Sequence, residues 1–251
     1  MKRFMLCSLF FVSGALFTFF VSKNFFCQHK NRGCFTMIDV ISEKKGTLIF
    51  LNGPSSSGKT SIVRALQDLF QEPYLRVSID GFLATMPRRF WGPDAKQANL
   101  GFEWVQSQDE QGPLTLVTVG PWGAKLIAGM YSALANLVEA GNNVVMDDVM
   151  LRKQSLFQAV HALKNLKVYF VGVKAPLPVL EERERARGDR ALSMARGQHR
   201  LVHAIVYEYG AYDFEIDTSL HTPEACAQLI KKYIDEHQWP QAFAKLGKNL
   251  R

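Results

Sequence analysis

The chain has 251 residues, which is enough for one sizeable α/β domain with a buried core. Hydrophobic residues make up 47% of the chain and charged residues 21%, a composition typical of globular proteins rather than disordered ones. The formal net charge is +7, but residues 1–36 contain five Lys and Arg residues and no acid, so the remaining chain carries only +2. Because the body is nearly neutral, its charge gives no argument for binding nucleic acid.

The first 36 residues differ in character from the rest of the chain. An apolar run from Phe4 to Val21 follows two basic residues and fits a signal peptide, a membrane anchor or a short transmembrane helix. Alternatively the working protein starts at Met37, and we favour this start, or a dispensable leader, over a true anchor. Three of the four cysteines lie in the leader, so the body offers no disulfide framework or cysteine metal site. We expect a cytoplasmic domain over residues 37–240, membrane-bound only if the leader is retained, and a loose tail over residues 241–251.

Residues 53–60 read GPSSSGKT and fit the phosphate-binding pattern G-x-x-x-x-G-K-[ST]. The apolar run Thr47–Leu51 before them predicts a buried strand, and the apolar spacing over residues 62–70 predicts a helix after them. In a strand–turn–helix arrangement the loop N–H groups and the helix N-terminus point at phosphate oxygens. The alternative is a Gly- and Ser-rich turn that merely caps a helix.

The loop pattern assigns roles to individual residues. Lys59 is expected to reach the β- and γ-phosphates, and the Thr60 hydroxyl to ligate Mg²⁺. The residues predicted to bind nucleotide are Gly53, Pro54, Ser55, Ser56, Ser57, Gly58, Lys59, Thr60 and Ser61.

A second predicted strand, Tyr74–Ile79, ends at Asp80 and Gly81. Ligands of open parallel sheets bind beyond the carboxyl ends of the strands, so Asp80 is placed for chemistry. The alternative is a turn formed by the Asp-Gly pair.

Residues 86–121 interrupt the α/β rhythm and are rich in Gly, Pro and aromatic residues. Two strand-like pieces, Gly101–Val105 and Leu114–Val119, flank a polar segment and predict an inserted hairpin. Its aromatic residues either line an acceptor pocket or pack the insertion onto the core. The aromatic residues in question are Phe90, Trp91, Phe102, Trp104 and Trp122.

A helix predicted over residues 122–140 leads to the strand Asn143–Asp148, which ends in two acids. An apolar strand that ends in acids is typical of the Walker B arrangement, in which a carboxylate holds Mg²⁺. The pattern leaves open whether Asp147 or Asp148 serves the metal. A helix over residues 154–163 and a strand over residues 167–173 follow.

Acids and arginines alternate over residues 181–190. The stretch predicts either a solvated helix held by i,i+4 ion pairs or a lid whose arginines close over a triphosphate. Arg183, Arg187 and Arg190 are three or four residues apart, so one helix face could present them together, and we favour the lid. A short strand over residues 212–217 and a helix opened by Pro223 complete the pattern.

With these motifs in order, the chain from Thr47 to Ile234 resembles the chloramphenicol 3-O-phosphotransferase family of P-loop kinases. The resemblance implies a five-stranded parallel sheet with helices on both faces, ATP as donor, and Asp80 as the catalytic aspartate. The insertion is longer and more aromatic here than in that family pattern, and the leader is absent from it. The matching pieces are Leu51–Gly53, Ser61–Arg64, Ile79–Asp80, Asp147–Val149, Val171–Val173, Ala186–Arg190, Val202–His203 and Asp217–Thr218.

The sequence therefore predicts an ATP- and Mg²⁺-dependent kinase that phosphorylates a hydroxyl of a small molecule, with a chloramphenicol-like acceptor as one candidate. Asp80, Lys59 and the three lid arginines are the predicted catalytic residues, and Thr60 with Asp147 or Asp148 the predicted metal ligands. The alternatives are a kinase of another small metabolite and a nucleotide-binding module without transferase activity.

Overall fold

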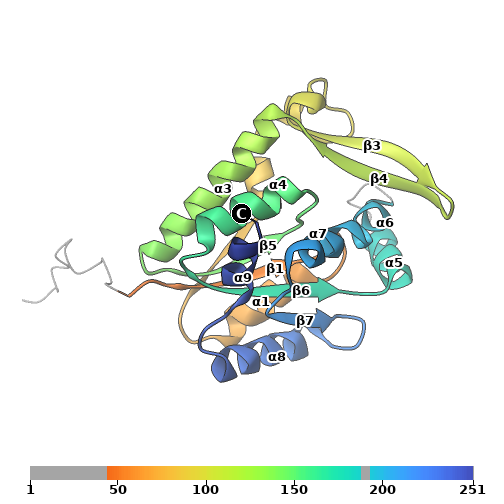
Figure 1. Cartoon of the computed structure of the whole chain (residues 1–251). Coiled ribbons are helices and arrows are strands. Elements are labelled where there is room, and N and C mark those ends of the chain that lie inside the picture. Colours follow the sequence, from red (N-terminus) through yellow and green to blue (C-terminus); the bar gives the residue numbers. More distant parts are fainter. Residues whose placement is uncertain (1–43, 188–192, 251) are drawn as a thin grey trace, which may run out of the picture. The chain divides into compact units, whose positions relative to one another are not determined.

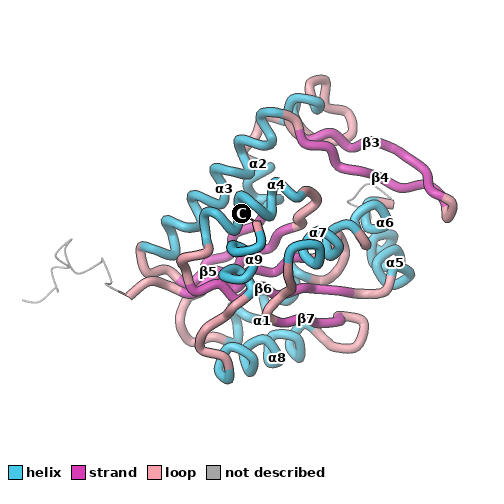
Figure 2. The backbone as a smooth tube through the Cα atoms, viewed as in Figure 1, coloured by secondary structure: helices cyan, strands magenta, loops and turns pink. Residues whose placement is uncertain are grey.

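The computed structural model describes residues 44–187 and 193–250, and the apolar leader lies outside this part of the chain. Its centre is a parallel sheet of five strands in the order β2-β5-β1-β6-β7 (Figure 1). Helices cover both faces of the sheet, as the sequence predicts (Figure 2). The strands are β1 (Thr47–Asn52), β2 (Tyr74–Ser78), β5 (Asn143–Asp148), β6 (Lys167–Lys174) and β7 (Phe214–Asp217).

The central strands are apolar on both faces because each face is covered by helices. In β1, Leu48 and Phe50 face one core cluster, whereas Ile49 and Leu51 face the other. The second cluster includes residues of α1 (Lys59–Leu69) and α8 (Pro223–Glu236), which pack against each other. The first cluster is built with α3 (Pro121–Glu139), α4 (Lys153–Leu163), α7 (Leu201–Tyr209) and α9 (Ala242–Asn249).

The predicted insertion forms a long antiparallel hairpin of β3 (Phe102–Asp109) and β4 (Gly112–Val119). It is separate from the main sheet and lies beside α6 (Met194–His199) (Figure 1). Arg196 of α6 joins three elements: it donates to the carbonyl oxygen of Gln111 in the hairpin turn and to Glu181 of α5 (Leu177–Arg187). The short helices α2 (Ile79–Ala84), η1 (Arg88–Phe90) and η2 (Ala98–Leu100) precede the hairpin.

The expectation of a loose tail over residues 241–251 is wrong for residues 242–249. These residues form α9, in which Phe243 and Leu246 are buried in the first core cluster. The Phe243 ring packs edge-on against Phe170, with 5.0 Å between the ring centroids. The Asp213 carboxylate accepts hydrogen bonds from the backbone N–H of Gln241 and of Ala242 and so fixes the start of the helix. Among the described residues, no helix is long and apolar enough to span a bilayer.

Phe243→Ala is expected to lower the free energy of unfolding by about 3–5 kcal/mol, because it leaves a cavity at a side chain that is only 3% exposed. Trp239→Ala, at a side chain that is 77% exposed, is the matched control and should change stability by about 0.5 kcal/mol or less. Urea unfolding measures both values. Equal stabilities of the two variants would show that α9 does not belong to the core.

Candidate active site

The loop between β1 and α1 has the backbone geometry that a phosphate-binding loop requires. Gly58 adopts a left-handed conformation with a φ of 89°, which favours glycine at this position. A Cβ atom at Gly53 would lie 2.3 Å from the carbonyl oxygen of Val173, so Gly53 allows a close approach of the loop to β6. The two fixed glycines of the motif therefore each have a physical reason.

The interior of the loop is polar and buried. The Lys59 ammonium group donates to the carbonyl oxygens of Gly53 and Pro54 at 2.9 and 2.8 Å. The hydroxyl oxygens of Ser55, Ser56 and Ser57 are buried, and no described residue forms a hydrogen bond with them. Buried polar atoms are normally paired, so these hydroxyls suit a polar ligand in the loop, and an anionic phosphate fits them.

The two acids at the end of β5 point to opposite faces of the sheet, as successive strand residues do. Asp147 faces the loop: its Oδ2 accepts a hydrogen bond from the Thr60 hydroxyl at 2.7 Å, and its Oδ1 lies 3.8 Å from Lys59 Nζ. Asp148 faces the other way and accepts a hydrogen bond from the Tyr131 hydroxyl at 2.6 Å. Burial raises the pKa of Asp148 to about 6. The geometry therefore distinguishes two acids that the sequence leaves equivalent.

The structure places Asp80 slightly differently from the prediction. Strand β2 ends at Ser78, whose hydroxyl accepts a hydrogen bond from the Gly81 N–H and caps α2. Asp80 lies in the first turn of this short helix rather than directly after the strand. It still lies at the carboxyl edge of the sheet, because Ser78 of β2 pairs with Asp147 of β5.

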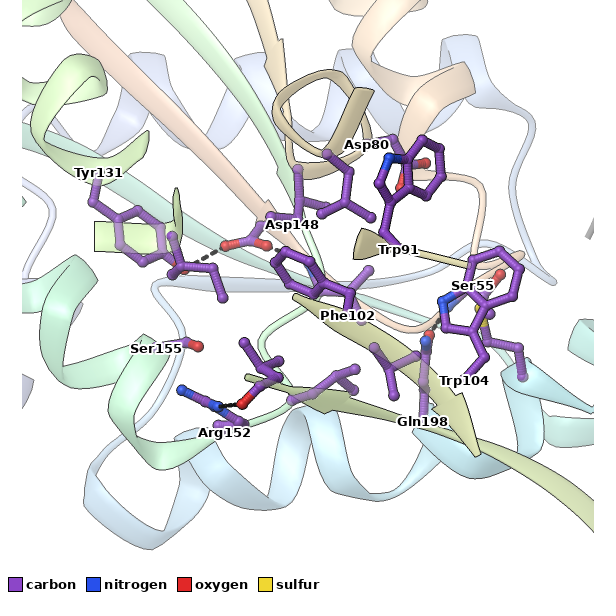
Figure 3. A pocket seen from close by; sticks show the side chains of 18 residues that line it. Ser55, Asp80, Trp91, Phe102, Trp104, Tyr131, Asp148, Arg152, Ser155 and Gln198 are labelled. Atoms are coloured by element: carbon purple, nitrogen blue, oxygen red, sulfur yellow. Dashed lines mark hydrogen bonds between the residues drawn. The ribbon is translucent and has the colours of Figure 1, made fainter. Parts of the chain in front are cut away.

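Two cavities meet at Asp80. The smaller one, of about 60 Å³, is lined by the phosphate loop together with Asp147 and Arg187. The larger one, of about 270 Å³, is mainly apolar and runs between the sheet edge, α3 and the hairpin (Figure 3). Asp80, Ser55, Ile79 and Val149 line both.

Three of the five aromatic residues that the insertion offers line the larger cavity. Trp91, Phe102 and Trp104 are lining residues, whereas Phe90 and Trp122 are not. Trp122 is instead half-exposed. Phe102 also belongs to the first core cluster and Trp91 packs against it, so for these two residues both expectations hold, and only Trp104 is a pocket wall alone.

Residues 181–187 of the charged stretch belong to α5, and the two arginines described there that were predicted for the lid make different contacts. Arg187 lines the smaller cavity, as a lid arginine would. Arg183 instead donates to the hydroxyl and to the carbonyl oxygen of Thr218, each at 2.8 Å. The Thr218 hydroxyl in turn donates to the carbonyl oxygen of Ser57 at 2.9 Å, so Thr218 links Arg183 to the loop. Arg190 lies outside the described residues.

Several residues that support the loop were not predicted from the sequence. The Gln198 side-chain oxygen accepts a hydrogen bond from the Ser55 N–H at 2.7 Å, and Gln198 also lines the larger cavity. Behind the loop, Asn52 donates to the Tyr212 hydroxyl at 2.8 Å, and His203 Nδ1 lies 2.9 Å from the same hydroxyl. Burial, together with the charge of Lys174, lowers the pKa of His203 to about 4. The sequence resemblance covered His203 and Thr218 but gave neither a role.

Within the described part of the chain, no group of three or more His, Cys, Asp or Glu residues is placed to hold a metal ion. The described residues therefore contain no site at which such protein side chains alone could hold a metal ion. Thr60 and Asp147 do fit a Mg²⁺ ion that arrives with a nucleotide, because Mg²⁺ typically takes one or two protein oxygens and completes its shell with phosphate and water.

The sequence model of the chloramphenicol phosphotransferase-like proteins matches residues 46–235. The chain belongs to this family. It is also 32% identical over 215 residues to a Mycobacterium tuberculosis protein named "Putative O-phosphotransferase", an alignment that covers 82% of this chain and 90% of that one. These matches confirm the resemblance seen in the sequence and support a phosphotransferase function.

Solved structures show the same fold at low sequence identity. The Mycobacterium tuberculosis APS kinase CysC, in complex with AMPPNP and APS, is 14% identical with a TM-score of 0.51, and the alignment covers 76% of this chain and 99% of that one. A sugar kinase from Janibacter sp. HTCC2649 is 16% identical with a TM-score of 0.52, covering 78% and 98%.

The low pKa of His203 predicts a specific dependence of stability on pH. A histidine binds a proton less tightly in the folded state when its pKa is lowered, so stability is lost as the pH falls from about 6.5 towards 4. His203→Gln removes this loss. The stability of the variant relative to the unaltered chain should therefore rise as the pH falls from about 6.5 towards 4. Urea unfolding at several pH values measures the stability difference between the two chains, and any pH-independent packing cost cancels from the change of that difference with pH. A difference that stays constant with pH would show that His203 titrates normally.

Proposed function

We propose that the protein transfers the γ-phosphoryl group of ATP to a hydroxyl of a small molecule bound in the larger cavity. The observation that carries this proposal is the position of Asp80, which lines both the phosphate-loop cavity and the apolar cavity. A carboxylate at this junction can take a proton from an acceptor hydroxyl while that oxygen faces the nucleotide.

The loop residues supply the nucleotide site. The Lys59 ammonium group and the N-terminus of α1 provide positive charge for the β- and γ-phosphates. Thr60 and Asp147 would hold Mg²⁺, which neutralises phosphate charge when it is bound. Arg187, at the edge of the same cavity, is placed to stabilise charge on the migrating phosphoryl group.

Asp80 acts as the general base in this mechanism. As the acceptor oxygen forms its bond to the γ-phosphorus, the bond from that phosphorus to ADP breaks, and the acceptor proton moves to Asp80. The reaction is mainly positioning and electrostatics, which suits a site built from backbone N–H groups, one lysine, one arginine and carboxylates. Arg183 and Gln198 hold the loop in place and are positioning residues.

The cavity walls favour an acceptor with an apolar or aromatic body, because Trp91, Phe102 and Trp104 line them. The family description makes chloramphenicol the first acceptor to test, and phosphorylation of that drug would be an antibiotic-resistance activity. A kinase of another small metabolite is the alternative within this mechanism. A nucleotide-binding module would not require an apolar cavity that shares its carboxylate with the phosphate loop.

Asp80→Asn keeps the size of the side chain and removes the base. We expect the turnover number to fall roughly 10²–10⁴-fold, with ATP affinity almost unchanged because the loop supplies ATP binding. Transfer to a panel of hydroxylated acceptors, with ATP binding measured by calorimetry, tests this. Near-normal transfer to every accepted substrate would reduce Asp80 to a helix residue, and a loss mainly of Mg²⁺ affinity would make it a metal ligand.

Lys59→Ala removes the ammonium group from the loop. We expect the turnover number to fall by about 10²–10³-fold, accompanied by weaker ATP binding. Lys125→Ala is the matched control, because Lys125 is exposed on α3 and lines neither cavity. If a folded Lys59→Ala protein turns over like the control, the nucleotide does not occupy this loop.

A further inference from the structure

Glu184 of α5 is a buried carboxylate that the mechanism above does not use. Its side chain belongs to a residue that is only 2% exposed, although it lies in the stretch where acids and arginines alternate. Buried acids are rare unless strong donors meet them. Oε2 of Glu184 accepts a hydrogen bond from the Ser193 N–H, and Oε1 accepts one from the Ala195 N–H, each at 2.8 Å. Both carboxylate oxygens therefore hold the backbone where α6 begins.

These two N–H groups are of the kind that a helix leaves unpaired at its start. Ser193 precedes α6 as its N-cap residue, but the Ser193 side chain makes no capping hydrogen bond. Ser193 also has a left-handed backbone conformation with a φ of 67°, which costs free energy in a residue that carries a Cβ atom. Glu184 thus supplies the cap of α6 from the neighbouring helix and fixes where α6 begins relative to α5.

The second half of α5 is held by polar contacts rather than by apolar packing. Leu180 packs in a small apolar cluster between α5 and α6, and after Leu180 the only buried residue described in α5 is Glu184. Glu181 receives the hydrogen bond from Arg196 of α6, and Arg183 donates towards the phosphate loop through Thr218. The contact of Glu184 with α6 is the last of these along the helix, so it governs the position of the final turn.

That final turn carries Arg187, the last residue of α5. Arg187 lines the smaller cavity together with Lys59 and Asp80. Because Asp80 also lines the larger cavity, Arg187 lies at the end of the nucleotide site where the γ-phosphoryl group is expected. Three residues of an α-helix rise by about 4.5 Å, so Glu184 is less than one turn from Arg187. A shift of this turn would be passed on to the guanidinium, and electrostatic stabilisation of a phosphoryl group depends strongly on such positions.

We propose that Glu184 is a positioning residue: by capping α6 it holds Arg187 at the γ-phosphoryl group of the nucleotide. This inference rests on the proposed function, in which Arg187 stabilises charge on that group. The role requires a carboxylate, because glutamine offers one acceptor oxygen, and its NH₂ group would face the second N–H donor.

The test compares AMPPNP with ADP, two nucleotides that differ by the γ-phosphoryl group. Calorimetry on the full chain with Mg²⁺ gives the ratio of their affinities without any acceptor. Arg187→Ala should lower the preference for AMPPNP by about 10–100-fold, as the loss of a charge-assisted hydrogen bond predicts. Glu184→Gln should lower it by about tenfold because Arg187 is misplaced, while the affinity for ADP stays within about twofold of that of the unaltered chain.

A double-mutant cycle separates positioning of Arg187 from a general loss of structure. In the Arg187→Ala background, Glu184→Gln should change the preference for AMPPNP by less than about twofold, because the residue through which Glu184 acts is gone. Glu182→Gln is the matched control, since it makes the same change of charge on the same helix at an exposed residue, and its preference should equal that of the unaltered chain. If Glu184→Gln does not fold, Glu184→Asp, which keeps the charge and withdraws the carboxylate by one methylene group, takes its place in the cycle with the same expected outcome.

Three results would each overturn the role of Glu184: an unchanged preference in the folded variant, an equal loss of ADP and AMPPNP affinity, or the same effect with and without Arg187. Transfer assays distinguish this failure from failure of the proposed function. Nucleotide preferences as expected, without transfer to any hydroxylated acceptor, would overturn the transfer reaction and support the positioning role. Normal transfer with an unchanged preference in the Glu184 variant would overturn the positioning role alone.

Discussion

The parallel pairing of β1 with β5 is the constraint on which the site depends. In this register Leu51 lies opposite Asp147 and Asn52 lies opposite Asp148. The chain leaves β1 directly into the phosphate loop, so the pairing brings the loop and both acids to one edge of the sheet. The Thr60–Asp147 hydrogen bond and the approach of Lys59 to Asp147 follow from this register. A shift of one residue would exchange the faces of the two acids, because side chains alternate along a strand.

Charged side chains are buried around the phosphate loop. Because a buried charge is costly unless it is paired, many hydrogen bonds surround the loop. Lys59 is held by two backbone carbonyl groups and by its proximity to Asp147, so its positive charge is compensated before any ligand arrives. Asn52 and His203 both hydrogen-bond to the Tyr212 hydroxyl and form a buried polar network behind the loop. These contacts position the loop. The hydroxyl groups of Ser55, Ser56 and Ser57 have no hydrogen-bond partner among the described residues, so they remain available to a ligand.

Much of the fold could be predicted from the sequence, because strands that are apolar on both faces and helices with one apolar face have distinct periodicities. The motif residues of the loop and Asp80 could be placed at the sheet edge for the same reason. The separate roles of Asp147 and Asp148 could not, since neither their spacing nor their chemistry distinguishes them, and only the strand register shows which one meets Thr60. Gln198 is far from the loop in sequence, and no motif marks it. The packing of α9 was missed although Ala242, Phe243 and Leu246 already share one helix face.

The attachment of the hairpin to α6 has a thermodynamic consequence. Thr115 of β4 donates from its N–H to the carbonyl oxygen of Ser193, and Arg196 ties α6 to the hairpin turn. The same helix carries Gln198, which holds the Ser55 N–H of the phosphate loop. In the proposed mechanism, an acceptor that displaced the hairpin on entering the larger cavity would therefore also displace a support of the nucleotide site. Thermodynamic linkage then requires the coupling to be reciprocal. The factor by which the acceptor changes the affinity for the nucleotide equals the factor by which the nucleotide changes the affinity for the acceptor.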